Sequence, residues 1–96
     1  MTKAYWIGRI DVEDAEGYKD YIATARPALE EHGARFIVRG GAFEAVEGVA
    51  RSRNVVIEFP SIEAARACYN SELYQKAKAI REQFSDGELI IIEGHA

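Results

Sequence analysis

Arginines, tyrosines and one glutamate are the side chains in this sequence best suited to bind or transform a ligand. One group combines a hydroxyl, two phenols and two guanidiniums: Ser71, Tyr21, Tyr74, Arg39 and Arg81. Tyr74 and Arg81 are seven residues apart, which places them on the same side of a helix. Together with the long connection 40–53, a kind of segment that often has a function, the group could rim a pocket between a helix and a sheet edge. The alternative is a helix cap at Ser71, a half-buried tyrosine and a solvated arginine.

A second group places one carboxylate among guanidiniums: Glu58 with Arg9, Arg35 and Arg39. A carboxylate flanked by arginines stays ionised, and an arginine left unpaired could hold a substrate carboxylate through two hydrogen bonds. The same charges could instead form an ion-pair network that fixes the register of a dimer. The sequence leaves both interpretations open.

Metal and cofactor sites are not expected. His32 precedes Gly33, where an imidazole interacts favourably with the C-terminal end of a helix, and His95 lies in the tail. No histidines or cysteines have the spacing of a metal site, and no cofactor motif is present. Cys68 stands among alanines and is predicted to be a small core residue.

Composition limits the possible partners. The 96 residues predict one domain, residues 1–96, with a net charge of −4. Because lysines and arginines do not cluster, neither nucleic acid nor an anionic membrane is expected as a partner. No run of about 18 apolar residues is present that could cross a membrane. The single cysteine cannot form an internal disulfide, which favours a reducing, cytoplasmic setting.

Strands and helices alternate along the chain and must position these side chains. Apolar and β-branched runs predict strands at 4–11, 34–40, 53–59 and 88–94. An apolar stripe predicts one helix from about residue 13 to about residue 32, kinked but unbroken at Pro27 and ended by Gly33. Ser61 is the predicted N-cap of a helix over 62–70. A further helix carries an apolar face at Leu73, Ala77, Ile80 and Phe84.

Two connections carry further expectations. Asp86 and Gly87 are typical turn residues and are expected to form a turn before the last strand. The polar connection 41–52 could contain a short extra strand at its centre.

The element order is that of the split βαβ, a ferredoxin-like α+β fold with a four-stranded antiparallel sheet and the helices on one face. In that fold the third strand lies between the first and the second. We expect a parallel match of the first and third strands to put Glu58 level with Arg9, and the hairpin of the second and third to put it opposite Arg35. Because an unpaired buried charge is costly, Glu58 is predicted to pair with Arg9, Arg35 or both.

Alternation along the strands predicts two apolar sheet faces. The face under the helices collects Trp6, Gly8, Ile10, Phe36, Val38, Val55, Ile57, Phe59, Leu89 and Ile91. The opposite face collects Tyr5, Ile7, Ile37, Val56, Ile90 and Ile92 together with Arg9, Arg35, Arg39 and Glu58. Leaving six large apolar side chains in water would cost several kcal/mol at about 25 cal/mol per Å². A second copy of the chain is the predicted cover, which makes a homodimer.

Several stretches, taken in order, resemble the domain-of-unknown-function family 1330, within the dimeric α+β barrel superfamily. They are Asp11 with Tyr18 and Tyr21, HGARF at 32–36, RGG at 39–41, FEAVEG at 43–48, RNVVIEFPS at 53–61, YNSELYQKAKAIR at 69–81 and EG at 93–94. Cys68 departs from the pattern, since the family often has tryptophan there. The resemblance implies a ferredoxin-like fold and a barrel-like dimer, and no established activity. Relatives by fold include antibiotic-biosynthesis-type monooxygenases, muconolactone isomerases and haem-binding chlorite dismutases.

The predicted function is to bind or transform a small polar or acidic metabolite in a pocket between sheet and helices. The predicted ligand-binding residues are Arg39, Glu58, Ser71, Tyr74, Arg81 and Tyr21. The alternative is a non-catalytic binding or interaction module whose charged sheet-face residues only fix the dimer. Catalytic residues and the reaction do not follow from fold-level analogy.

Overall fold

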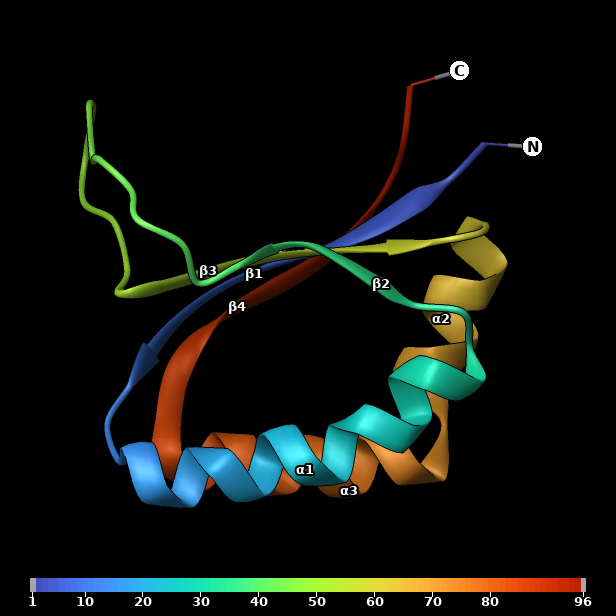
Figure 1. Cartoon of the computed structure of the whole chain (residues 1–96), viewed down its shortest axis with the longest axis horizontal. Helices are drawn as coiled ribbons and strands as arrows, with labels where there is room; N and C mark the ends of the chain where they lie inside the picture. Colours follow the sequence, from blue (N-terminus) through green and yellow to red (C-terminus); the bar gives the residue numbers. More distant parts are fainter. Residues whose placement is uncertain (1, 96) are drawn as a thin grey trace.

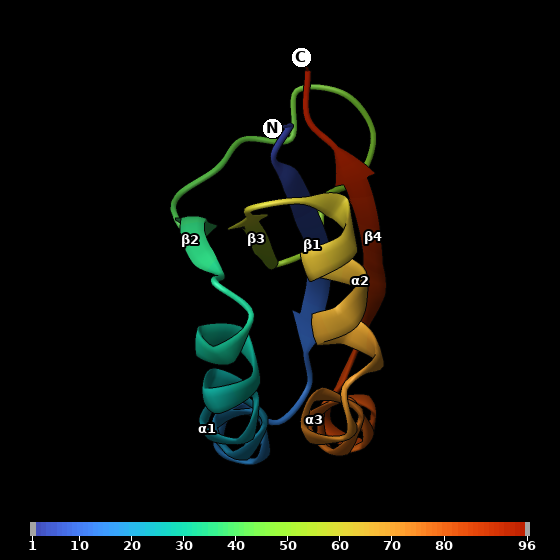
Figure 2. The same cartoon turned by 90° about the vertical axis from the view of Figure 1, so that its right-hand side faces the viewer.

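A sheet covered by helices on one side makes up the structure, a computed structural model that describes residues 2–95 (Figure 1). The elements are β1 (Ala4–Val12), α1 (Ala15–Glu31), β2 (Arg35–Arg39), β3 (Arg53–Phe59), α2 (Ile62–Asn70), α3 (Glu72–Phe84) and β4 (Ser85–Glu93). The strand order is β2-β3-β1-β4, with each neighbouring pair antiparallel. All three helices lie on one face, as two views show (Figures 1 and 2), and the other face stays open. The predicted α+β fold is confirmed.

The helix α1 runs through Pro27 without a break, as predicted. Its N-cap is Asp14, whose carboxylate accepts hydrogen bonds from the backbone N–H groups of Glu16 and Gly17. The helix bends towards the sheet over its last turns (Figure 1). At the other end His32 Nδ1 lies 2.8 Å from the carbonyl oxygen of Ala28. Gly33 follows with a φ of 74°, the left-handed conformation that ends a helix.

The expected turn at Asp86–Gly87 is wrong, because both residues belong to β4. Gly87 lies opposite Ile10 of β1. A Cβ atom at Gly87 would lie 2.3 Å from the carbonyl oxygen of Arg9, so only glycine allows the two strands this close an approach. The glycine therefore extends the β1–β4 pairing where the sequence suggested a turn.

A bulge in β2 overturns the predicted faces of Val38 and Arg39. The register shifts between Phe36 and Val38, so that Val38 lies opposite Val56 and Arg39 lies opposite Val55. Because a one-residue shift moves each following side chain to the other face, Arg39 joins the helix-covered face and Val38 the open one. Strict alternation along the strand could not predict this.

The predicted parallel match of the first and third strands is also wrong. The two strands are antiparallel, which places Glu58 opposite Tyr5 and leaves Arg9 opposite Asn54. Arg35 does lie opposite Glu58 in the hairpin register, as expected. Within residues 2–95, however, the ion pair of Glu58 is formed with Lys3, at 3.1 Å, and neither predicted arginine takes part.

Aromatic side chains fill the core between the sheet and the helices. Trp6, Tyr74, Phe59 and Cys68 are the largest fully buried side chains. The indole of Trp6 donates a hydrogen bond to the carbonyl oxygen of Ala65 at 3.1 Å, which satisfies its buried N–H. The prediction that Cys68 is a core residue is confirmed. Among residues 2–95 no helix is both long and apolar enough to cross a membrane.

Candidate functional site

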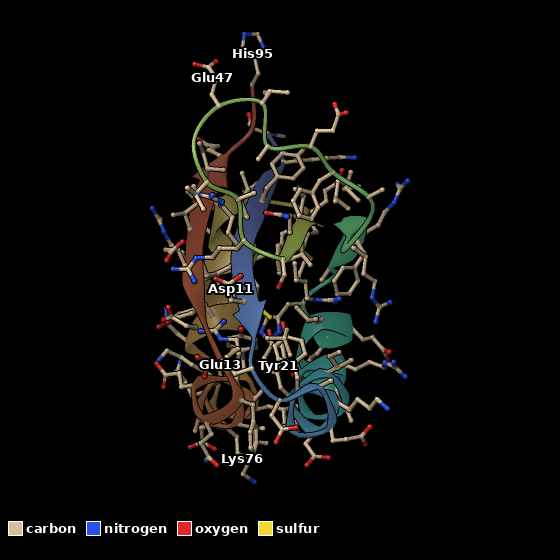
Figure 3. The ribbon with its side chains drawn as sticks, turned by 90° about the vertical axis from the view of Figure 1, so that its left-hand side faces the viewer. Asp11, Glu13, Tyr21, Glu47, Lys76 and His95 are labelled. Atoms are coloured by element: carbon tan, nitrogen blue, oxygen red, sulfur yellow. The ribbon has the colours of Figure 1, made fainter. Side chains whose placement is uncertain are left out.

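Between α1, α3 and the sheet lies a group of three phenols and a guanidinium, here named the tyrosine cluster: Tyr18, Tyr21, Tyr74 and Arg81. The hydroxyls of Tyr21 and Tyr74 are hydrogen-bonded at 2.9 Å, and Arg81 Nη1 donates to the Tyr74 hydroxyl at 2.9 Å. The guanidinium of Arg81 also lies 5.7 Å from the ring centroid of Tyr21. Figure 3 shows Tyr21 between the two helices, beneath the sheet. The polar groups of Tyr21, Tyr74 and Arg81 are therefore partnered inside the protein.

Helical spacing explains why these residues meet. Tyr18 and Tyr21 are three residues apart on α1, and Tyr74 and Arg81 are seven apart on α3, so each pair shares one helix face. Ser71 fixes where α3 begins, because its hydroxyl accepts from the backbone N–H of Tyr74 at 3.2 Å and donates to a carbonyl at 2.7 Å. Ser71 is therefore the N-cap of α3.

Burial holds the phenols of Tyr18 and Tyr74 in the protonated form. Burial raises the pKa of Tyr74 far above its usual range, with a further contribution from Tyr21 that Arg81 opposes. Burial likewise raises the pKa of Tyr18, and Tyr21 adds to the effect, while the nearby guanidinium of Arg53 opposes it. At neutral pH these phenols are hydrogen-bond donors and not general bases.

A pocket lies next to the cluster, between α1 and the sheet edge formed by β2, and we call it the α1–β2 pocket. Its volume is about 170 Å³. The lining consists of five apolar residues, three arginines and one glutamate: Ile22, Ala25, Leu29, Ala34, Phe36, Arg26, Arg39, Arg53 and Glu30. An apolar cavity of about 150 Å³ accommodates benzene, so this space suits a molecule built on a single small ring.

Two strand residues bring arginines to the pocket. The β2 bulge turns Arg39 to the helix-covered face, where its guanidinium carbon lies 4.3 Å from the ring centroid of Phe36. Arg53 starts β3 and lies opposite Ile10, also on the helix-covered face. Its guanidinium carbon is 5.6 Å from the ring centroid of Tyr18. Because Tyr18 belongs to the tyrosine cluster, the cluster and the wall of the pocket are continuous.

The structure divides the predicted site residues among four places. Tyr21, Tyr74 and Arg81 come together in the tyrosine cluster, as the helical spacing suggested. Arg39 lines the neighbouring pocket. Ser71 caps a helix, and Glu58 lies on the open sheet face beside Lys3.

Sequence reasoning missed Arg53 and Tyr18. Arg53 shares the strand parity of Val55 and Ile57, both assigned to the helix-covered face, and this was the signal that could have identified it. Tyr18 was named among the stretches that resemble the family, with no role in a site assigned to it. Its closeness to Arg53 depends on how α1 packs beneath the sheet, which no local pattern shows.

The open sheet face carries apolar side chains without cover in this chain. The exposed or half-buried apolar side chains on this face are those of Tyr5, Ile7, Val38, Val56, Ile90 and Ile92. The loop of residues 40–52, which contains neither helix nor strand and so overturns the expected extra strand, rises on the same side (Figure 1). Val46 and Val49 in this loop are 84% and 91% exposed.

Ion pairs connect the base of that loop to the sheet. Arg51 forms ion pairs with Asp11 of β1 and with Asp86 and Glu88 of β4. Arg9 adds a hydrogen bond to the carbonyl oxygen of Val49 at 3.1 Å. The loop is thus anchored at its base, while its exposed tip reaches away from the sheet, where Figure 3 shows Glu47.

Within residues 2–95 the structure assembles neither a group of metal ligands nor a thiolate nucleophile. Among the residues that the structure describes, no three histidine, cysteine, aspartate or glutamate side chains are grouped as metal ligands would be. Burial, with a smaller contribution from Glu31, raises the pKa of Cys68 to about 12. The thiol is therefore protonated at neutral pH and behaves as an apolar core group.

Solved structures with the same fold share little sequence with this chain. A protein of unknown function from Rhodopseudomonas palustris superposes with a TM-score of 0.79 at 18% identity, over 99% of this chain and 84% of that one. SnoaB, a cofactor-independent oxygenase from Streptomyces nogalater, gives 0.71 at 11% identity, over 100% and 96%. A dimeric protein of unknown function with a ferredoxin-like fold from Bacteroides fragilis gives 0.60 at 14% identity, over 96% of both chains. At such identities the likeness concerns the fold.

Sequence comparison is decisive for the family. No curated protein matches the sequence. The family model described as "Domain of unknown function (DUF1330)" matches residues 3–95, nearly the whole chain. The ordered stretches quoted above predicted this family, and the prediction is confirmed. The chain belongs to the DUF1330 family.

Proposed function

We propose that this protein binds a small polar or acidic metabolite in the α1–β2 pocket. The observation that carries the proposal is the pairing of Arg39 and Arg53 with apolar walls in one cavity of about 170 Å³. Ligand pockets in proteins are mostly apolar, with a few polar groups that fix orientation. A cavity of this size is smaller than the roughly 300–1,000 Å³ of pockets for drug-sized molecules, so the ligand is compact.

Binding without chemistry is the favoured form of this function. The phenols beside the pocket are protonated, and Cys68 is a protonated thiol, so neither group supplies a base or a nucleophile at neutral pH. The fold itself accommodates catalysis, since SnoaB is a cofactor-independent oxygenase. An enzyme of that kind is therefore the second candidate, and turnover of a bound ligand would distinguish it.

Native mass spectrometry of freshly purified protein tests the proposal, by detecting a small molecule that co-purifies with the chain. Ala34→Leu, which extends a lining residue into the pocket, should abolish that adduct. Ala23→Leu is the matched control, because Ala23 is exposed on α1 outside the lining. An adduct that survives Ala34→Leu would place the ligand elsewhere and overturn the proposal.

We also infer that two copies of the chain pair through the open sheet face. The support is the uncovered apolar surface of β1, β3 and β4 and the exposed loop tip on the same side. The similar protein from Bacteroides fragilis is dimeric. Light scattering at micromolar concentration should give twice the 10.7 kDa chain mass. A folded monomer at that concentration would contradict the inference.

The cytoplasmic setting, which the single cysteine favours, stays a prediction.

A further inference from the structure

We propose that the ligand of the α1–β2 pocket is a small carboxylic acid with an apolar body, and that Arg53 binds its carboxylate. The inference rests on the proposed function, because it requires that the pocket bind a ligand. It goes further by naming the chemical class and the residue that recognises it. Arg53 is one of three arginines in the lining, and it differs from the other two because one of its nitrogens is buried without a hydrogen-bond partner.

The side chain of Arg53 has an unused donor. Its Nε is buried and has no hydrogen-bond partner within residues 2–95, and it is the one buried side-chain nitrogen or oxygen there of which this is true. Buried polar groups in native proteins are nearly always hydrogen-bonded, and an exception calls for an explanation. Because Arg53 lines the adjoining pocket, a small rotation of its guanidinium would bring Nε to a ligand oxygen there, and that oxygen would supply the missing acceptor.

The geometry of a guanidinium favours a carboxylate as that acceptor. Nε and one terminal nitrogen form a planar fork that matches the two oxygens of a carboxylate, and such paired bonds are stronger than those to a neutral group. The lining holds Arg26, Arg39 and Arg53 against the single carboxylate of Glu30, so its net charge is positive. An anion is therefore attracted into the pocket.

The other walls define the body of the ligand. Ile22, Leu29 and Phe36 present apolar surface, and the guanidinium of Arg39 stacks over the Phe36 ring at 4.3 Å. A free phosphate would leave this apolar surface unused. A carboxylate attached to one small ring or branched chain uses both the charge and the apolar walls.

Two neighbours hold Arg53 in position. The guanidinium carbon lies 5.6 Å from the ring centroid of Tyr18. The second neighbour is Gly40, with a φ of 67°, where an added Cβ atom would lie only 2.9 Å from Arg53 Nη1. The missing side chain at Gly40 therefore leaves room for the guanidinium, and a preorganised group loses less entropy when it binds.

Calorimetric titration with benzoate, benzamide and inorganic phosphate tests the proposal on the full chain. Benzoate should bind about 10- to 100-fold more tightly than benzamide, its neutral analogue of the same shape, and phosphate should bind more weakly than benzoate. Arg53→Gln should remove the preference for benzoate and leave the weak binding of benzamide. Arg35→Gln, an exposed arginine of β2 outside the pocket lining, should leave the preference intact.

Glycine substitutions supply a second, independent test. Gly40→Ala should weaken benzoate binding as Arg53→Gln does, because the new methyl group displaces the guanidinium. Gly48→Ala is the matched control: its φ of 76° imposes similar backbone strain, but nothing lies within 4 Å of its added Cβ. If Gly48→Ala weakened binding as much as Gly40→Ala, backbone strain would explain both and the role of Gly40 would be overturned.

The Nε–Hε resonance of Arg53 gives a readout that needs no variant except for its assignment. Titration with benzoate should shift this signal, and titration with benzamide should not. Equal affinity for benzoate and benzamide, with an unmoved Arg53 signal, would refute the carboxylate while leaving the pocket as a binding site. Benzoate that bound equally well to Ala34→Leu would refute the pocket itself, so the two proposals fail in distinguishable ways.

Discussion

The tyrosine cluster and the α1–β2 pocket use the same kinds of side chain in opposite ways. In the cluster, Arg81 lies near the ring of Tyr21 and donates a hydrogen bond to the hydroxyl of Tyr74 at 2.9 Å. In the pocket, Arg53 lies near the ring of Tyr18, but its buried Nε has no partner among residues 2–95. The guanidinium of Arg81 completes a hydrogen-bond network, whereas that of Arg53 has one donor without an acceptor.

This difference separates a structural role from the binding role that we propose for the pocket. A hydrogen-bonded group inside a protein stabilises the fold modestly, but removal of its partner leaves the remaining group unsatisfied at a larger cost. A buried polar group that is unsatisfied in the native state lowers stability, and a ligand that supplies the missing partner removes that cost. Substitutions in the cluster should therefore change stability most, and substitutions at the pocket should change binding.

Tyr74→Phe should have the largest effect on stability. The substitution removes a hydroxyl that is 0% exposed and leaves both Tyr21 and Arg81 without their partner. We expect the free energy of unfolding to fall by about 1–3 kcal/mol. Chemical denaturation measures the change. Tyr69→Phe is the control, because the hydroxyl of Tyr69 makes no hydrogen bond within residues 2–95, and it should have little effect.

Alkaline pH should reveal the same buried phenols. The folded-state pKa values of Tyr18 and Tyr74 are raised by burial, so above pH 10 the unfolded chain loses protons that the folded protein retains. Their contribution is complete below that pH and is lost as the pH rises towards the folded-state pKa values, by at most about 1.4 kcal/mol per pH unit for each tyrosine.

The variants separate this effect from general alkaline unfolding. Cys68, with a pKa raised to about 12, adds a loss of the same sign between pH 9 and pH 12. Tyr74→Phe should reduce the slope of stability against pH, and Tyr69→Phe should not. An unchanged slope in Tyr74→Phe would show that the phenol is in contact with water.

Substitution of each arginine tests the difference between the two guanidiniums directly. Arg81→Gln should lower the free energy of unfolding by about 1–2 kcal/mol, because Tyr74 loses a charged donor. Arg53→Gln should lower it by less than about 0.5 kcal/mol, since its Nε makes no hydrogen bond and the substitution removes only the contact with Tyr18. Thermal unfolding of both variants in parallel is the measurement. Equal losses would mean that the two guanidiniums have the same structural role.

Much of the fold could be predicted from the sequence, because its elements are set by local patterns. The apolar stripe of α1 and its end at Gly33 depend on residues close together in the chain, and so does the cap at Ser61. The tyrosine cluster was partly predicted for the same reason, since Tyr74 and Arg81 share a helix face.

What could not be predicted depends on register. The bulge in β2 moves Arg39 to the pocket, and nothing in RFIVR indicates a bulge. The sequence predicts a turn at Gly87, yet the residue lies within β4, where a side chain would collide with the backbone of Arg9 in β1. The partner of Glu58 depends on the direction in which β1 and β3 pair, and the parallel match assumed from the sequence was wrong. The α1–β2 pocket depends on all of these together.

Glu58→Gln should have the smallest effect, and it extends the comparison to a pair at the surface. The ion pair joins Glu58, whose side chain is 16% exposed, to Lys3, whose side chain is 56% exposed. Exposed pairs contribute about 0–1 kcal/mol and are screened by salt. In the monomer, at a protein concentration too low for two copies to pair, Glu58→Gln should lower stability by less than about 1 kcal/mol, and by still less in 1 M salt, where the Debye length is about 3 Å. A loss of several kcal/mol in the monomer that persisted in high salt would show that the carboxylate is already desolvated within one chain.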